Sequence, residues 1–383
     1  MSKNTNSNDV EVALGVAIDG WRASGRALKE ELRELGLLAA TAGARLEEIE
    51  VQQRSKPDPS TMIGSGKVEE LSEKSKDFDL VIFNENLKPA QHDKLREKFP
   101  VKVIDRTDLI LDIFAQRAHT KDAKMQVELA QLQHNLPRKR GWGWALTNPG
   151  AGIGTRGPGE TKMTIKERDL RERIHQLESR LEKIRDKRRT QRKNRRGIPE
   201  LSLVGYTNSG KTTLLNNFSD SDERQEDMLF ATLDTKTRRV HLEGDRYFLL
   251  TDTVGFIQRM PPKLKDAFVA TLEELDRANC LLHVIDITGA RLQEKMETVT
   301  ELLEELSVTD RPIFKVFNKI DLASEGLIDR YRKKFPGAYF VSAQTGEGLT
   351  KLKESIYRYL LENNLIERPD YAKNLPLREM ISQ

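Results

Sequence analysis

Short apolar runs alternate with amphipathic helical segments along most of the chain. In the N-terminal part, runs that have the length and pattern of strands lie at residues 12–18, 46–51, 80–83 and 101–104. Segments with helical spacing of apolar residues separate them, and this alternation favours a mainly parallel sheet covered by helices. The sequence therefore predicts a small α/β domain over residues 11–106, after a polar, disordered N-terminus at 1–10.

A second set of short apolar runs occupies the C-terminal half. These runs lie at residues 201–204, 247–250, 281–285, 314–317 and 339–341. They predict a doubly wound α/β domain with a mainly parallel sheet over residues 198–363, followed by a short C-terminal extension at 364–383.

Between the two α/β patterns the chain carries a helical seam. Its apolar residues are spaced four and three apart, at Leu170, Ile174, Leu177, Leu181 and Ile184. Two heptads are short for an autonomous coiled coil, so the seam needs a partner. We expect a helix over residues 110–136, ended by Pro137, to pair with it as an antiparallel helical hairpin within residues 107–197.

The connector of this hairpin, residues 137–160, is rich in glycine and basic residues and holds two of the chain's three tryptophans. Downstream, residues 185–196 contain eight Lys and Arg residues against one Asp, within a chain whose net charge is only +4. Basic residues can track phosphates and aromatic rings can stack on bases, which favours RNA contact over a solvated linker. The candidate RNA-binding residues are Arg138, Lys139, Arg140, Trp142, Trp144, Arg156, Arg188, Arg189, Arg192 and Arg195.

The composition narrows the class of protein. Hydrophobic residues make up 37% of the 383 residues and charged residues 32%. A single cysteine, Cys280, excludes a disulfide framework, and we expect it to be a buried apolar residue of a strand. No apolar run has membrane-spanning length. We therefore expect a cytoplasmic protein without a membrane span, acting as a monomer.

The pattern G-x-x-x-x-G-K-[ST] of a phosphate-binding loop occurs at residues 205–212, between a predicted strand and a predicted helix. The glycines let backbone N–H groups close on a polyphosphate at a helix N-terminus. Lys211 can reach the terminal phosphates, and the hydroxyl of Thr212 can hold Mg²⁺. A similar Gly-Ser-Gly-Lys at residues 64–67 lacks this context, and we interpret it as the entry turn of a helix.

Further motifs follow predicted strands in the order of a GTP site. Asp252 can hold Mg²⁺ through water, and the N–H of Gly255 can meet a γ-phosphate. Asp321 can accept two hydrogen bonds from guanine, whereas adenine lacks that donor pair and would leave the acceptors unpaired. A backbone N–H at Ser342-Ala343 can meet the guanine O6. Ligands of open α/β sheets bind at the ends of strands, so these motifs predict a GTPase.

A switch segment is expected at residues 229–234, where Thr232 would add a hydroxyl to Mg²⁺ and sense the γ-phosphate. The predicted catalytic residues are Lys211, Thr232 and Gly255. The predicted GTP-binding set is Gly205, Tyr206, Thr207, Asn208, Ser209, Gly210, Lys211, Thr212, Thr213, Phe230, Ala231, Thr232, Leu233, Asp234, Asp252, Thr253, Val254, Gly255, Asn318, Lys319, Asp321, Ser342 and Ala343.

One catalytic group common in GTPases is missing. The position after Gly255, where a glutamine often orients the attacking water, is Phe256. Slow intrinsic turnover is expected, with a partner completing the site. Asn208 is a candidate ligand for a K⁺ ion that would lie against the phosphates, although its amide can equally well bond its own loop.

The glycine-rich connector ending at residues 154–161, the phosphate loop, the switch segment and Asp252-Thr253-Val254-Gly255-Phe256-Ile257 together resemble the HflX-type GTPases. The resemblance implies binding to the large ribosomal subunit, with the hairpin loop directed toward the peptidyl-transferase region. It further implies splitting of stalled or idle ribosomes, often under stress, with ribosome-stimulated GTP hydrolysis. The C-terminal extension is shorter than in longer members of that family. The residues themselves leave two alternatives open: a signalling GTPase whose hairpin binds protein, and an RNA-remodelling NTPase that uses ATP through its N-terminal unit.

Overall fold

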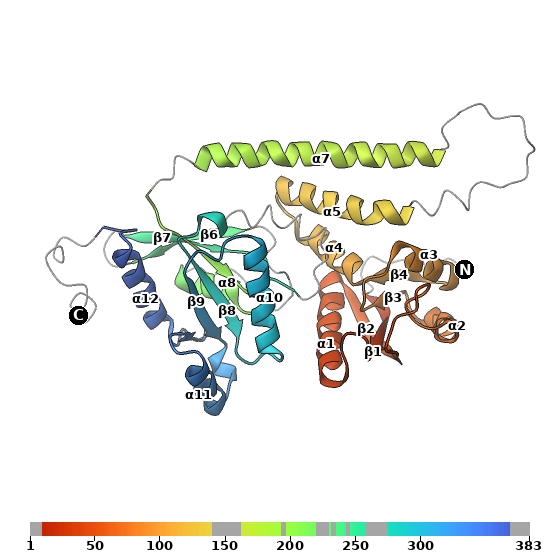
Figure 1. Ribbon diagram of the computed structural model, residues 1–383, viewed down its shortest axis with the longest axis horizontal. Helices are drawn as coiled ribbons and strands as arrows, with labels where there is room; N and C mark the ends of the chain where they lie inside the picture. The colour runs from red at the N-terminus through yellow and green to blue at the C-terminus, as the bar shows by residue number, and fades with distance from the viewer. Residues whose placement is uncertain are drawn as a thin grey trace, which may run out of the picture. The chain divides into compact units, whose positions relative to one another are not determined.

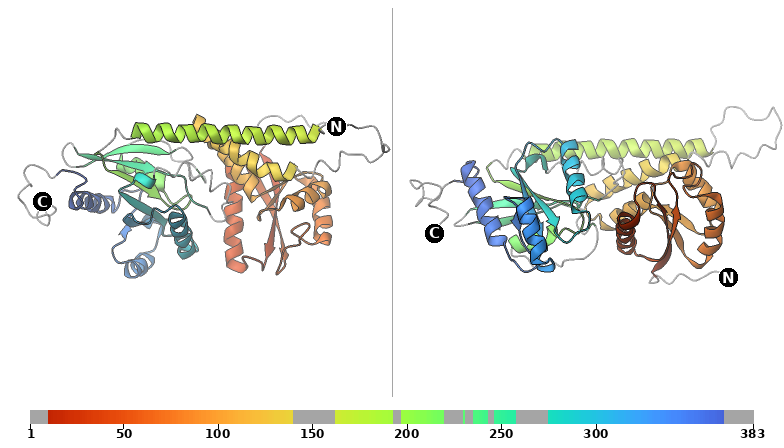
Figure 2. Two further views of the ribbon diagram at one scale, coloured as in Figure 1. Left: turned by 45° about the horizontal axis from the view of Figure 1, so that its top comes forward. Right: turned by 60° about the horizontal axis from the view of Figure 1, so that its bottom comes forward.

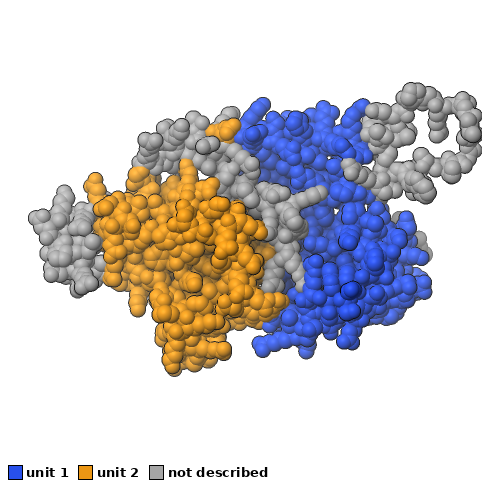
Figure 3. All heavy atoms as spheres, viewed as in Figure 1, with its two compact units in different colours: residues 1–183 blue, residues 184–383 orange. Residues whose placement is uncertain are grey.

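The computed structural model describes residues 10–139, 162–192, 197–219, 230, 235–242, 246–257 and 275–367. At residues 139, 162–166, 185 and 187–192 it describes the backbone alone. The chain forms two compact units, residues 1–183 and 184–383 (Figure 3). The fold class is α/β, and the boundary between the units falls within the helix α7 (Lys162–Arg192).

Unit 2 is built on a six-stranded sheet with the order β10-β9-β8-β5-β7-β6 (Figure 1). All neighbouring strands are parallel except β6, which runs antiparallel to β7. The strands are β5 (Glu200–Val204), β6 (Lys236–His241), β7 (Tyr247–Asp252), β8 (Cys280–Asp286), β9 (Ile313–Asn318) and β10 (Tyr339–Phe340). The order reverses at β5 and β8, and such a switch point opens a crevice at the carboxyl ends of the strands.

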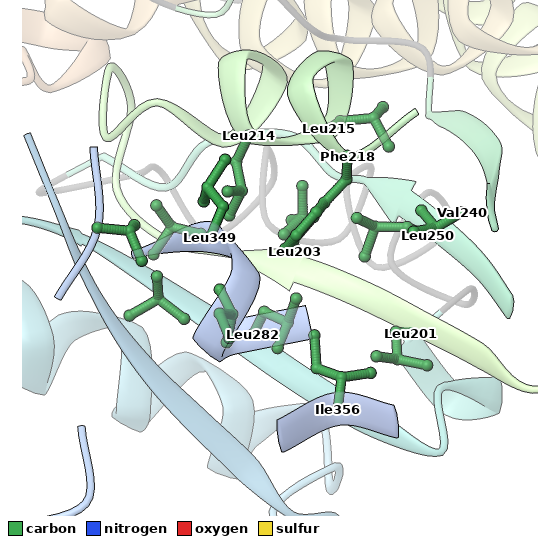
Figure 4. Packing of buried hydrophobic residues seen from close by; sticks show 14 of the residues in the cluster. Leu201, Leu203, Leu214, Leu215, Phe218, Val240, Leu250, Leu282, Leu349 and Ile356 are labelled. Carbon is green, nitrogen blue, oxygen red and sulfur yellow. The ribbon is translucent and has the colours of Figure 1, made fainter. Parts of the chain in front are cut away.

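Helices cover both faces of this sheet. They are α8 (Lys211–Phe218), α10 (Leu292–Glu305), α11 (Glu325–Lys334) and α12 (Leu349–Glu362), with 3-10 turns at Leu275–Arg277 and Ile320–Leu322. Leucines of β5 and β8 pack between α8 and α12, as Leu203, Leu214, Leu282 and Ile356 illustrate in Figure 4. Cys280 is fully buried in this core, as predicted, and burial raises the pKa of its thiol to about 12.

Unit 1 contains a four-stranded parallel sheet with the order β2-β1-β3-β4. Its strands are β1 (Glu11–Asp19), β2 (Ala44–Gln53), β3 (Leu80–Phe83) and β4 (Lys102–Asp105), and its helices include α1 (Gly25–Ala42), α2 (Ser65–Lys74) and α3 (Pro89–Lys98). All four predicted strands are present. Gly64 caps α2, and Lys67 pairs with Glu50 and Glu70, which confirms that residues 64–67 form a helix entry.

The prediction of a single helix ended by Pro137 is wrong. The chain forms α4 (Arg106–Arg117) and α5 (Lys121–Lys139), and Pro137 lies inside α5. Ala118 is extended, with ψ 105°, and the Thr120 hydroxyl accepts a hydrogen bond from the N–H of Ala123 at 3.2 Å. A threonine that caps in this way begins a new helix, which hydrophobic spacing alone does not reveal. A proline so near a helix end removes only one backbone hydrogen bond.

The apolar seam of α7 finds the partner that it needs in α5 (Figures 1 and 2). Leu177 and Leu181 are buried. Arg173 of α7 pairs with Glu128 of α5 at 2.7 Å, and Gln133 donates to Glu178 at 3.1 Å.

Among the described residues no helix is long and apolar enough to cross a membrane.

Arg138, at the end of α5, does not fit its predicted RNA contact. Its side chain is 7% exposed and donates to Asp108 at 2.7 and 2.8 Å and to Asp105. Asp105 ends β4 and caps α4, so the guanidinium ties the end of α5 to the edge of the sheet. Burial, with the nearby charge of Asp108, raises the pKa of Asp105. Despite its own burial, the pKa of Asp108 is held well below its usual range by the hydrogen bond from His134 and the charge of Arg138.

Replacing Arg138 with Met is expected to destabilise unit 1 by about 3 kcal/mol, because the Asp105 carboxylate would stay buried without its counter-charge. Urea titration, monitored through the hydrogen exchange of peptides from α4, measures the loss of stability. Arg173→Met is the matched control, since the side chains of its ion pair with Glu128 are 41% and 40% exposed, and such a pair should contribute little to stability. Equal losses in the two variants would contradict the structural role given to Arg138.

Candidate functional site

The phosphate loop lies between β5 and α8, at the switch point of the sheet. A Cβ atom on Gly205 would lie 2.3 Å from the carbonyl oxygen of Val284, and one on Gly210 would lie 2.2 Å from Nδ2 of Asn318. Both glycines also have positive φ angles, 154° and 92°. Asn208 is left-handed too, with φ 58°, and is exposed. Glycine is therefore required at both ends of the loop, where it passes against β8 and β9.

The segment after β7 closes on this loop through its backbone. The N–H of Thr207 donates to the Phe256 carbonyl at 2.7 Å, and the N–H of Phe256 donates to the Gly205 carbonyl at 3.1 Å. Gly255 packs so closely that a Cβ would lie 2.8 Å from Cα of Thr207. Phe256 itself is buried and carries no polar side-chain atom. Its side chain therefore cannot orient a water molecule.

Lys211 is folded back into the loop. Its ammonium is buried and donates to the carbonyls of Gly205 at 3.1 Å and Tyr206 at 2.9 Å. Burial lowers the pKa of Lys211 to about 8, although the charge of Asp252 opposes the shift. His283, buried nearby in β8, has a pKa lowered to about 3 by burial and by the charges of Lys315 and Lys211, so it is neutral. The lysine is the only one of these two groups that can bring positive charge to the loop.

Two side chains with oxygen atoms that can bind a hard metal ion lie beside the loop. The Thr212 hydroxyl at the start of α8 donates to Asp252 at 2.6 Å, and Asp252 is fully buried at the end of β7. The hydroxyls of Thr207 and Ser209 are buried as well, with no hydrogen-bond partner among the described residues. Hydroxyl and carboxylate oxygens suit Mg²⁺, and buried unpaired hydroxyls suit a polar ligand. This donor set fits a magnesium-bound polyphosphate.

Asn318, the last residue of β9, joins three segments. Its amide donates to the carbonyl of Ser209 at 2.9 Å and accepts from the N–H of Ala343 at 2.8 Å. Asn217 of α8 donates to the Ala343 carbonyl at 3.1 Å. Asp321 is exposed on the 3-10 turn that follows. The predicted phosphate and base motifs are thus brought to one edge of the sheet.

One predicted contact in this region stays a prediction, because its donors are bonded within the protein. The N–H of Ala343, expected to meet a guanine O6, donates to Asn318 in the structure, and the N–H of Ser342 donates to the Glu347 carbonyl at 2.9 Å. To meet a guanine O6, either N–H would have to leave or share its present acceptor.

Part of the predicted site lies outside the described residues. In the switch segment only Phe230 is described, buried and left-handed with φ 55°. The residues beyond the description are Ala231, Thr232, Leu233, Asp234, Arg140, Trp142, Trp144, Arg156 and Arg195. Lys139, Arg188, Arg189 and Arg192 are placed on α5 and α7 by their backbone alone.

Sequence reasoning missed two neighbours of the site. Asp286, at the end of β8, forms an ion pair with Lys319 at 2.8 Å. Lys295 of α10 lies over the ring of Tyr206, 5.0 Å from its centroid. Asp286 follows a buried strand just as Asp252 does, and this position was the available signal. No local sequence pattern predicts the contact of Lys295 with Tyr206.

Comparison with known proteins gives matches along most of the chain. Family models described as "GTP-binding GTPase N-terminal", "GTP-binding GTPase Middle Region" and "50S ribosome-binding GTPase" match residues 29–115, 117–195 and 200–319. GTPase HflX of Caldanaerobacter subterraneus is 43% identical over 360 residues, covering 93% of this chain and 82% of the relative. GTPase HflX of Escherichia coli is 43% identical over 334 residues, covering 85% and 78%. A crystal structure of an SsGBP–GDP complex is 26% identical with a TM-score of 0.51, covering 92% of this chain and 99% of that one.

The stability of the nucleotide-free protein is expected to depend on the pH through Lys211. Its pKa is about 8 when folded, against an ordinary value of 10.5, so between these pH values the unfolded chain binds the extra proton. Stability therefore rises with pH across this window, by about 3 kcal/mol relative to Lys211→Met. Urea titrations of both proteins at several pH values measure the difference. Parallel curves from pH 8 to 10.5 would contradict the lowered pKa of Lys211.

Proposed function

The chain belongs to the HflX family of GTPases, and from this premise we propose that it acts on the large ribosomal subunit and separates stalled or idle ribosomes into subunits. As a member of this family it hydrolyses GTP to GDP and phosphate. Support for the ribosomal target comes from residues 200–319, which match the family model described as a 50S ribosome-binding GTPase. The single observation that carries the GTP site of this proposal is the phosphate loop, with Lys211, Thr212 and Asp252 gathered around it.

In the proposed site the backbone of residues 205–213 surrounds the phosphates of GTP. Lys211 turns from the carbonyls of Gly205 and Tyr206 to the terminal phosphates, whose negative charge raises its pKa again. Thr212, Asp252 and Thr232 of the switch segment would hold Mg²⁺, with Asp252 expected to act through water. When bound, the ion neutralises charge that develops on the transferred phosphoryl group.

The same site divides the recognition of phosphate and base between its two halves. The N–H of Gly255 meets the γ-phosphate, while Thr253 and Val254 keep this segment against the sheet; Thr253 donates to the Leu203 carbonyl at 2.6 Å. Asp321 reads the guanine edge, and Asn318 fixes the loops on either side of it. For Ala343 to reach the guanine O6, its N–H has to leave or share Asn318.

Hydrolysis by the isolated protein is expected to be slow, because the buried Phe256 replaces the residue that would orient water. We assign Asn208 as a ligand of K⁺. Its side chain is exposed in the phosphate loop, where its backbone is left-handed. A K⁺ ion there would add positive charge against the phosphates, as an arginine finger does.

RNA contact is assigned to the connector 137–160 and to the basic end of α7, with Arg138 removed from the set. Its candidate side chains are Lys139, Arg140, Trp142, Trp144, Arg156, Arg188, Arg189, Arg192 and Arg195. GTP orders the segment around Thr232 and favours ribosome binding, and hydrolysis then releases the protein. The membership of the HflX family also favours a role under stress.

GTP turnover by the purified protein should be stimulated strongly by large ribosomal subunits and should be faster in K⁺ than in Na⁺. We expect the subunit to complete the site, in which Phe256 cannot orient water, and the cation effect should disappear in Asn208→Ala. Turnover with and without subunits, in both salts, measures this. Lys211→Met is the control that lacks a phosphate-binding lysine.

Sedimentation of 70S ribosomes with the protein and GTP then tests the separation of subunits. Turnover that ignores subunits, with intact 70S particles, would overturn the ribosomal proposal in favour of a signalling GTPase. ATP turnover that survives in Lys211→Met would instead favour an NTPase site in unit 1.

A further inference from the structure

An ion pair lies beside the residues proposed to bind guanine. Nζ of Lys319 lies 2.8 Å from a carboxylate oxygen of Asp286, and the two side chains are 23% and 25% exposed. Lys319 follows β9 directly and has a left-handed backbone, with φ 65°. The residues on either side of it are Asn318, which holds the phosphate loop, and the 3-10 turn that carries Asp321.

The carboxylate of Asp286 is itself held in place. Its other oxygen accepts from the N–H of Thr288 at 2.9 Å and from the Thr288 hydroxyl at 2.6 Å. The backbone of the same turn is fixed by Gly289, whose N–H donates to the Asp286 carbonyl, and by Ile287, whose N–H donates to the Asn318 carbonyl, both at 3.1 Å. A carboxylate with so many local bonds presents its remaining oxygen to Lys319 in one direction.

We propose that Asp286 is a positioning residue for guanine recognition, which holds the ammonium of Lys319 so that the stem of that lysine lies across the face of the base. This inference rests on the proposed assignment of residues 318–321 to the guanine site. Asp321 then reads the edge of the base, and the stem of Lys319 excludes water from its face. A lysine side chain has a flexible stem of four carbons. Fixing its end before the nucleotide binds therefore lowers the conformational entropy that is lost on binding.

A merely structural ion pair predicts a different outcome. A partly exposed pair contributes little to stability, so its loss would change neither unfolding nor nucleotide affinity. A pair that only competes with the nucleotide would, when removed, strengthen binding. The positioning role alone predicts weaker binding of nucleotide with unchanged stability of the nucleotide-free protein.

The test is Asp286→Asn in the full chain. The amide can still accept from Thr288, but its NH₂ group cannot accept from an ammonium. The dissociation constants of GDP and GTP should rise roughly three- to tenfold. The loss should appear in KM and not in kcat, and the thermal midpoint without nucleotide should stay unchanged. Asp329→Asn, which removes an exposed carboxylate 3.4 Å from Arg332, is the matched control and should change nothing.

Two further measurements keep the outcome decisive. In a Lys319→Met background, Asp286→Asn should add no further loss, because the group that it positions is gone. IDP, which lacks the exocyclic amine, should be weakened by the same factor as GDP in Asp286→Asn, whereas Asp321→Ala should lose the distinction between them. Unchanged or tighter GDP binding in Asp286→Asn, or an additive loss in the double variant, overturns the inference. An Asp321→Ala variant that still distinguishes GDP from IDP overturns the guanine-site assignment itself.

Discussion

The side-chain amide of Asn318 is the contact on which the rest of the site depends. It is almost fully buried, and it bonds the phosphate loop through Ser209 and the loop after β10 through Ala343. Gly210 lies so close to the amide that any side chain there would collide with it. Both partners are backbone groups, so the loss of this amide would leave a buried carbonyl and a buried N–H unsatisfied, which is costly. One side chain thereby fixes segments that lie more than one hundred residues apart in sequence.

Each unit buries a cationic side chain, but the two side chains have different partners. In unit 2 the ammonium of Lys211 donates hydrogen bonds to loop carbonyls, and burial lowers its pKa. Phosphate oxygens of a bound nucleotide can replace these carbonyls as acceptors. In unit 1 the guanidinium of Arg138 is paired with the carboxylates of Asp105 and Asp108, which a ligand would not readily replace. The first arrangement suits a ligand site, whereas the second anchors the end of α5 at the point where the connector begins. The difference follows from the partners: neutral carbonyls release a cation far more readily than paired carboxylates do.

Apolar runs predicted the strands well, because β3, β5 and β8 are buried on both faces and leave a continuous hydrophobic signal. The same signal missed β6, whose Lys-Thr-Arg-Arg sequence lies at the edge of the sheet, and it ran across the break between α4 and α5. Candidate phosphate and magnesium residues could be proposed from sequence because their chemistry depends on local spacing, and the structure brings Lys211, Thr212 and Asp252 together. The burial of Arg138 and the pairing of Asp286 with Lys319 could not be predicted, for the same reason. A sequence shows which residues are charged but not which of them form ion pairs, and here the partners come from different elements.

The equilibrium affinity of Asn318→Ala for GDP tests the central claim most directly, with Asn217→Ala as its control. Asn217 makes one hydrogen bond to the same loop, whereas Asn318 makes two and joins the loop to the phosphate-binding segment. The account predicts a loss of roughly 100-fold for Asn318→Ala, from about 3 kcal/mol of unsatisfied backbone groups, and a much smaller loss for Asn217→Ala. Equal affinities in the two variants would contradict it.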